Sequence, residues 1–347
     1  MKRRFGIGLT LALCLMLVVS ILVSAQSTSK YLVTNFVLVN LSPDDAEGSI
    51  NYYKEDGSAW TGSGYTSFGP GQTHELPGDG GQLTVRQYSD TLTAGRGSVM
   101  VASNVQLGAV VQLRLAPGDT TLPSSSAYVG VNEGSSKYYL PLVQARRVTG
   151  TGLANTQIMV QNLGDSAIDF NINFFGEPGS GSTPATYTKS VTGLQSGATF
   201  FYDLQQETAL NDGWNGSAEV DAGVNKVAVV VNSFNGSHGL RTYNGFPEEN
   251  VGTTWGIPLF ASKLSNGLNT SVSVQNLSGA DIPVGGLTIT CPDAPAGYFP
   301  KSNTAVIPDK GTFAFNPVGN ISNPNDWHGH CGINAGSAHI VALVIKS

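Results

Sequence analysis

The chain contains few charged residues. Only 12% of its 347 residues are Asp, Glu, Lys or Arg, which is about half the usual share. The balance is acidic, with 24 acidic against 18 basic residues and a net charge of −6. A coiled coil uses charged flanking positions and a nucleic-acid-binding protein uses a basic face. The composition therefore excludes a coiled coil and predicts no nucleic-acid partner.

The chain also lacks the short motifs that accompany common enzyme chemistry. It has no Gly-x-Ser-x-Gly elbow, no His-Glu-x-x-His pair and no calcium loop with alternating oxygen ligands. A glycosidase needs two carboxylates across a cleft, and no pair is identified by the sequence. We therefore expect no enzyme activity and no cofactor. An extracellular hydrolase assembled from distant residues stays as the third hypothesis on function.

Long apolar runs are missing except at the N-terminus. Residues 2–4 are basic, residues 6–23 are almost continuously apolar, and Val23-Ser24-Ala25 is a small-residue cleavage site. This pattern predicts a signal peptide over residues 1–25; the alternative is an uncleaved membrane anchor, since the run is nearly long enough to span a bilayer. Cleavage would change the net charge from −6 to −9 and leave no transmembrane segment. We expect a secreted or cell-surface protein.

Cysteine is rare, and only Cys291 and Cys331 follow the predicted cleavage site. Cys291 continues the alternation of Leu287 and Ile289, and Cys331 is in phase with Ile333, so both side chains should point inward. An even cysteine number in an exported chain favours a disulfide. The sequence therefore predicts a Cys291–Cys331 bond, with two buried free thiols as the alternative.

Glycine and turn signals are abundant, with 43 glycines in the chain. Between the turns, apolar residues alternate with polar ones, as in Ile168, Phe170, Ile172 and Phe174. A period of two indicates β-strands with one buried face. Many short strands of this kind predict an all-β fold of immunoglobulin-like two-sheet sandwiches.

Two landmarks recur three times along the chain. An apolar strand ends in Asn-Leu at Asn40, Asn162 and Asn276, which are 122 and 114 residues apart. A glycine follows each asparagine after 57, 54 and 53 residues, at Gly97, Gly216 and Gly329. A tryptophan, Trp214 or Trp327, precedes the glycine by two residues in the last two copies only. Such periodicity is typical of tandem domains. We predict three sandwich repeats after the signal peptide, over residues 26–136, 137–253 and 254–347.

The repeated segment carries a resemblance to a known kind of protein. Its pattern is Asn-Thr-x-apolar-x-Val-Gln-Asn-Leu, at residues 155–163 and 269–277, with Leu-Pro-Leu at 140–142 and Ile-Pro-Leu at 257–259. The chain resembles uncharacterised secreted bacterial surface proteins with tandem immunoglobulin-like β-sandwich repeats. The resemblance covers most of residues 31–347 and implies a surface or matrix role. The first repeat departs from it, because it lacks the Asn-Thr pair and the tryptophan.

Candidate binding residues are scarce. His328 and His330 lie two apart on a predicted strand, so both imidazoles share a face, as in some zinc and copper sites. A closed site needs three or four ligands and only two are identified. We therefore expect no bound metal and treat these histidines as landmark residues of the repeat. Tyr53 and Trp60 are the aromatic side chains that we expect to be free to stack on a glycan.

The chain ends suggest a further role. Repeats two and three begin with a strand that repeat one lacks, and repeat three ends without the closing strand that follows residues 107–115 and 227–231. An unpaired sheet edge is a template for another strand. We therefore name Val341, Leu343 and Ile345 as a candidate assembly edge.

The function predicted is a structural or adhesive protein that binds cell-surface or matrix polymers, or itself; the alternative is a carbohydrate-binding protein.

Overall fold

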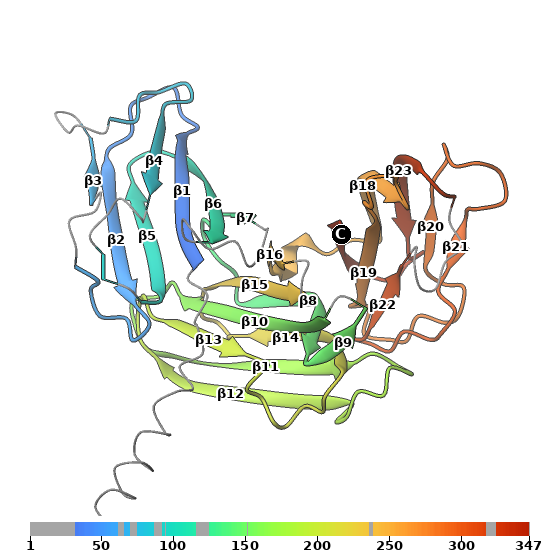
Figure 1. The fold of residues 1–347 in the computed structure, drawn as a ribbon. Helices are drawn as coiled ribbons and strands as arrows, with labels where there is room; N and C mark the ends of the chain where they lie inside the picture. The colour runs from blue at the N-terminus through green and yellow to red at the C-terminus, as the bar shows by residue number, and fades with distance from the viewer. Residues whose placement is uncertain are drawn as a thin grey trace, which may run out of the picture.

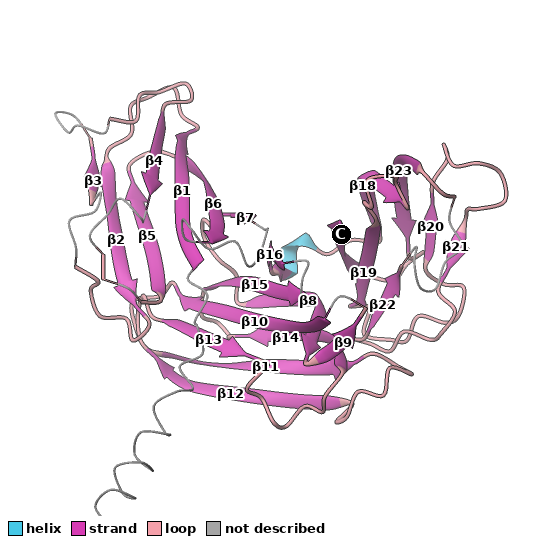
Figure 2. Ribbon diagram, viewed as in Figure 1, coloured by secondary structure: helices cyan, strands magenta, loops and turns pink. Residues whose placement is uncertain are grey.

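The structure is a computed structural model of the chain. It describes residues 32–61, 66–69, 75–86, 92–93, 95–115, 125–150, 152–235, 239–316 and 324–346. The predicted signal peptide, residues 1–25, lies outside the described residues. Nearly all regular structure in the described part is β-strand, arranged in antiparallel sheets. The prediction of an all-β multidomain fold is confirmed (Figures 1 and 2).

The strands fall into three units, each with two sheets and its own core. Unit 1 contains β1 (Leu32–Asn40), β2 (Gly48–Lys54), β3 (Ser67–Phe68), β4 (Gln82–Arg86), β5 (Gly97–Ser103), β6 (Leu107–Leu115) and β7 (Ser126–Val129). Unit 2 contains β8 (Lys137–Ala145), β9 (Arg147–Thr149), β10 (Gly152–Asn162), β11 (Ile168–Gly176), β12 (Thr186–Leu194), β13 (Thr199–Asp203), β14 (Trp214–Asp221), β15 (Val227–Asn235), β16 (Gly239–Asn244), β17 (Phe246–Pro247) and the 3-10 helix η3 (Glu248–Asn250). Unit 3 contains β18 (Thr254–Ser262), β19 (Thr270–Asn276), β20 (Thr288–Thr290), β21 (Lys301–Ser302), β22 (Thr312–Phe315), β23 (Trp327–Asn334) and β24 (Ile340–Lys346).

The strand order repeats from unit to unit. The sheet that holds the Asn-Leu landmark runs β4-β1-β6-β7 in unit 1, β13-β10-β15-β16 in unit 2 and β22-β19-β24 in unit 3. The opposite sheet runs β3-β2-β5, β12-β11-β14-β8-β17 and β21-β20-β23-β18. A separate hydrophobic cluster fills each unit. The landmark strand therefore has a neighbour on both sides in every repeat.

The landmark asparagines are buried and hold the turn that follows their strand. The Nδ2 group of Asn162 donates to the Ser166 and Leu194 carbonyls at 2.7 and 3.0 Å, and its Oδ1 accepts from the Gly164 N–H at 2.8 Å. The side chains of Asn40 and Asn276 make the equivalent bonds: each accepts from the backbone N–H two residues later and donates to the carbonyl four residues later. All three side chains are at most 1% exposed. A buried amide is stable only with its polar atoms bonded, which explains why the residue recurs.

The landmark glycines make room for an indole ring. A Cβ atom on Gly216 would lie 2.8 Å from the Trp214 ring, and one on Gly329 would lie 2.5 Å from the Trp327 ring. In unit 1 the ring comes from elsewhere: a Cβ on Gly97 would lie 3.0 Å from Trp60. Trp60 follows β2, whereas the other two tryptophans begin β14 and β23. The tryptophan that the first repeat lacks in sequence is thus replaced in space by Trp60.

The cysteines form the predicted bond. Cys291 and Cys331 are disulfide-linked with their Cα atoms 4.2 Å apart, and both side chains are 3% exposed within the core of unit 3. Cys331 lies on β23, and Cys291 directly follows β20, which pairs with β23. The bond therefore joins neighbouring strands within one sheet of unit 3.

Unit 2 is bonded to both of its neighbours. Towards unit 1, the Asn244 side chain bonds the N–H and carbonyl of Val129, so that β16 lies beside β7. Towards unit 3, the Thr312 hydroxyl donates to the Pro141 carbonyl at 2.8 Å. The Lys310 ammonium lies 2.9 Å from the Glu219 carboxylate and 4.9 Å from the centre of the Tyr139 ring. Figure 1 shows units 1 and 3 at the two ends of unit 2.

The Lys310–Glu219 ion pair should matter for the docking of unit 3 on unit 2. Its side chains are only 26% and 9% exposed. Replacing Lys310 with Met removes the partner of the Glu219 carboxylate across the interface and leaves it only the more distant Lys137 of unit 2. We expect this to cost about 2 kcal/mol of unfolding free energy. Denaturant titration measures it, and adding Glu219→Gln should restore most of the loss. Equal destabilisation by the single and double variants would contradict the ion-pair explanation.

Candidate functional site

Within the described chain, β5 and β24 each have a neighbour on one side only, where the corresponding strand of another unit has two. β5 pairs with β2 alone, whereas its counterparts β14 and β23 also pair with β8 and β18. β24 pairs with β19 alone, whereas β6 and β15 also pair with β7 and β16. Within the described residues, unit 1 thus lacks an opening strand and unit 3 lacks a closing strand.

The β5 edge carries apolar side chains. Val99 and Val101 lie opposite the core residues Tyr52 and Ile50 in the β2–β5 ladder, so they face the inside of the sandwich. Val101 is nevertheless 36% exposed, while Val220, at the matching position of β14, is fully buried. β8 covers Val220 in unit 2, and no described strand does this for Val101.

The β24 edge differs from the one expected. Val341 and Leu343 are 0% and 7% exposed and lie on the face opposite the unit 3 core, where β24 contacts β8 of unit 2. The backbone of Ile340 bonds Gly252, and the His339 carbonyl accepts from Leu277 of the β19 side. Hydrogen-bonded pairs alternate along an antiparallel ladder. The backbone groups of the odd-numbered residues of β24, Ile345 included, therefore bond β19. Val341, Leu343 and Ile345 therefore lie on an edge strand, as expected, but the backbone groups that point away from β19 belong to Ala342, Val344 and Lys346. The role of this edge in assembly stays a prediction.

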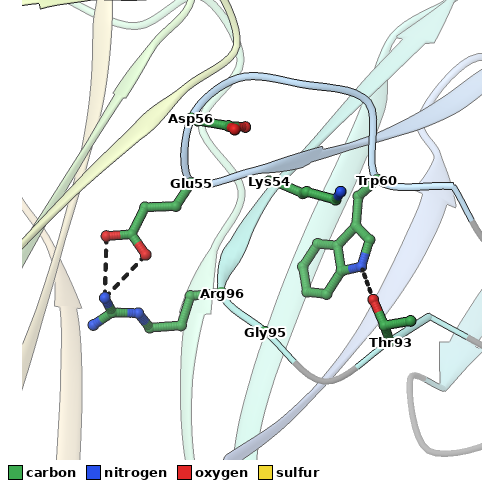
Figure 3. Close-up of a pocket in the computed structure, with 7 residues that line it drawn as sticks. All are labelled: Lys54, Glu55, Asp56, Trp60, Thr93, Gly95 and Arg96. Atoms are coloured by element: carbon green, nitrogen blue, oxygen red, sulfur yellow. Dashed lines mark hydrogen bonds and ion pairs between the residues drawn. The ribbon is translucent and has the colours of Figure 1, made fainter.

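A hollow of about 390 Å³ lies on unit 1 beside Trp60. Its lining combines one indole, four charged side chains and two small residues: Lys54, Glu55, Asp56, Trp60, Thr93, Gly95 and Arg96. Figure 3 shows the ring on one side and the Glu55–Arg96 ion pair, 2.9 Å long, on the other. Hydrogen bonds from Ser58 hold the pKa of the exposed Asp56 carboxyl below its ordinary value. The hollow thus presents fixed charges beside an aromatic ring.

The two aromatic residues proposed for glycan stacking are less free than the sequence suggested. The Trp60 indole is half-buried, with the backbones of Gly95 and Gly97 against it, and its Nε1 donates to the Thr93 hydroxyl at 3.1 Å. Tyr53 is half-buried, and its ring packs so closely on Gly197 of unit 2 that a Cβ atom added to Gly197 would clash with it. Tyr53 therefore belongs to the contact between units 1 and 2, and it does not line the hollow with Trp60.

His328 and His330 lie on β23 with exposed side chains, two residues apart as expected. The Nδ1 atom of His330 is 2.7 Å from the Asp293 carboxylate, a partner that the sequence did not identify. Among the described residues, no group of three or more His, Cys, Asp or Glu side chains is placed to hold a metal ion. In the same part of the chain, no helix is long and apolar enough to cross a membrane.

Comparisons with known proteins add little to this description. No protein-family model matches the chain, and no curated protein matches it. A solved structure titled "Crystal Structure of Thermotoga maritima 1070" is similar over 33% of this chain and 97% of its own, with 18% identity and a TM-score of 0.27. A likeness at this TM-score carries no argument.

Proposed function

We propose that this protein is secreted or displayed at the cell surface, where it acts as a structural or adhesive protein by binding or scaffolding. The observation that carries the proposal is that, among the described strands, β5 in unit 1 and β24 in unit 3 each have one free side. An exposed sheet edge binds an added strand through main-chain hydrogen bonds. Its partners would be cell-surface or matrix polymers, or further copies of the chain.

The contacts between units support a scaffold. The Ser98 hydroxyl donates to the Gly197 carbonyl at 2.8 Å, and the Arg96 guanidinium lies 4.8 Å from the centre of the Phe201 ring. With the buried bonds to unit 3, these contacts hold successive sandwiches in fixed orientations. Flexible linkers would instead let each domain move independently. A rigid row of domains keeps its binding edges at a set separation. The disulfide supports export, because such bonds persist in oxidising compartments outside the cytoplasm.

Carbohydrate binding is the second candidate, and the hollow beside Trp60 favours it. A saccharide could stack on the part of the indole that faces the hollow and bond the charged groups around it. Because Trp60 also packs on Gly97, Trp60→Ala would disturb the fold as well as a ligand. Lys54→Ala and Asp56→Ala are better probes, since both side chains are exposed. Glycan-array binding that both variants weaken would support this candidate.

The proposed function is tested by location and retention. Antibody labelling of intact host cells and of the culture fluid should detect the protein, and purified protein should bind isolated cell envelopes or matrix saturably. Heat-denatured protein serves as the control. Protein found only inside the cell, or native protein that is retained no better than the denatured control, would overturn the proposal.

A further inference from the structure

β5 stands out among the sheet edges because it carries none of the features that protect an edge from pairing. Such features are charged residues, proline and bulges. The other described edge strands of five residues or more each have one: Arg86 on β4, Lys189 on β12, Asp203 on β13, Arg241 on β16, Pro258 and a bulge on β18, and Lys346 on β24. β5 reads Gly-Ser-Val-Met-Val-Ala-Ser, with no charge, no proline and an unbroken register to β2.

The direction of the free backbone groups on β5 follows from its ladder with β2. The Asn104 N–H donates to the Glu47 carbonyl at 3.0 Å, so these two residues form a hydrogen-bonded pair. Bonded pairs alternate along an antiparallel ladder, and Ser98, Met100 and Ala102 therefore bond β2. The odd-numbered residues 97, 99, 101 and 103 direct their N–H and C=O groups away from β2.

We propose that β5 is a dimerisation edge, at which it pairs antiparallel with β5 of a second copy about a two-fold axis at Met100. The inference rests on the proposed function, since it names one partner for a sheet edge. In this register Val99 lies opposite the partner's Val101, and Gly97 lies opposite the partner's Ser103. Each of these pairs consists of two residues whose backbone groups point outward, so each pair exchanges two hydrogen bonds.

The sequence of β5 suits this self-pairing. A two-fold contact at Met100 brings the residues next to the axis close to their own copies, so a charge at residues 99–101 would meet a like charge. β5 has no charge, although the whole chain carries −6. The strand is also nearly palindromic around Met100, with Val on both sides and small residues beyond. The apolar Val99 and Val101 side chains therefore meet valines of the partner on the face that continues the core.

The geometry of the other units shows that a strand fits at this position. β8 lies antiparallel to β14, and β18 lies antiparallel to β23, at the position beside β5 where the described residues place no strand. An antiparallel β5 from a second copy would occupy the same place in unit 1. The Ser98 end of β5 contacts unit 2, and in the antiparallel dimer the partner's unit 2 lies at the other end of the strand.

Cysteine cross-linking tests the register. Met100 and its copy form a non-hydrogen-bonded pair, with Cα atoms about 4.5 Å apart, which is within the range of a disulfide. Met100→Cys should therefore give a covalent dimer on mild oxidation of the exported protein. Ala102→Cys is the matched control: residue 102 lies opposite the partner's Ser98, and the Cα atoms of the two cysteines would be about 14 Å apart. Equal cross-linking of the two variants would overturn the proposed register.

Proline substitution tests the edge itself. The Val101 N–H points away from β2, so Val101→Pro removes a bond to the partner and none to β2. Light scattering during gel filtration should give the molar mass of two chains for the native protein and of one chain for this variant. Val344→Pro, which removes an outward N–H at the β24 edge, should stay dimeric. A monomeric native protein at millimolar concentration, or a dimer that Val101→Pro leaves intact, would overturn the inference.

The two proposals can fail separately. A strictly monomeric protein that still binds cell envelopes saturably would overturn β5 pairing and leave the proposed function standing. A β5-linked dimer that is found only inside the cell would do the reverse.

Discussion

Replacing Asn162 with Ala should cost unit 2 about 4 kcal/mol of unfolding free energy. The substitution removes three hydrogen bonds made by a side chain that is fully buried. Ser166 is exposed and Leu194 half-buried, so water can replace the lost donor at their carbonyls. The loss comes from three hydrogen bonds worth about 1 kcal/mol each and from the cavity left by the amide. Urea titration followed by tryptophan fluorescence measures the effect, because Trp214 lies in the core of the same unit.

Asn171→Ala is the matched control for this prediction. Asn171 is exposed on β11 of the same unit, where its side chain bonds only the Ser190 hydroxyl among the described contacts. Exposed substitutions usually change stability by less than about 0.5 kcal/mol. If Asn162→Ala were as mild as its control, the role of the landmark asparagine in holding the turn would be contradicted.

The repeat was predictable because each landmark residue has a local cause. The asparagine holds the turn beside it, and the period-two pattern of residues such as Phe170 and Phe174 marks the buried face. These contacts recur at the same spacing in every unit. They could therefore be recognised from the chain alone, and so could the one-sided pairing of β5 and β24 within the described residues.

Contacts between units and between distant strands were not predictable in this way. The alternation correctly places Val341 and Leu343 on one face of β24, but it cannot show that unit 2 covers that face. In the same way, the pattern cannot show that Gly197 of unit 2 packs on Tyr53 and leaves it half-buried. Trp60 replaces a tryptophan that the other units carry on a different strand, so no spacing rule reveals the substitution. The His330–Asp293 contact likewise joins residues whose proximity depends on a loop.

Removing the disulfide should produce the other large effect. The bond between Cys291 and Cys331 closes a loop of 40 residues, and a loop of this length is worth about 4 kcal/mol in the chain-entropy model. The Cys291→Ala/Cys331→Ala variant should therefore lose about that amount, with the loss confined to unit 3. Both side chains are buried among apolar neighbours, so alanine leaves no unpaired polar group.

Hydrogen exchange can separate the units in this experiment. Amides of β19 and β23 should exchange faster in the double variant, while those of β10 and β14 in unit 2 keep their protection. Adding a reducing agent to the native protein is the control, because it breaks the bond without changing the sequence, and it should reproduce the faster exchange once the buried bond is reached. Unchanged exchange in unit 3 would contradict a stabilising role for the disulfide. Equal loss of protection in unit 2 would instead show that units 2 and 3 unfold together, as expected if the bonds of Lys310 and Thr312 to unit 2 make them one cooperative block.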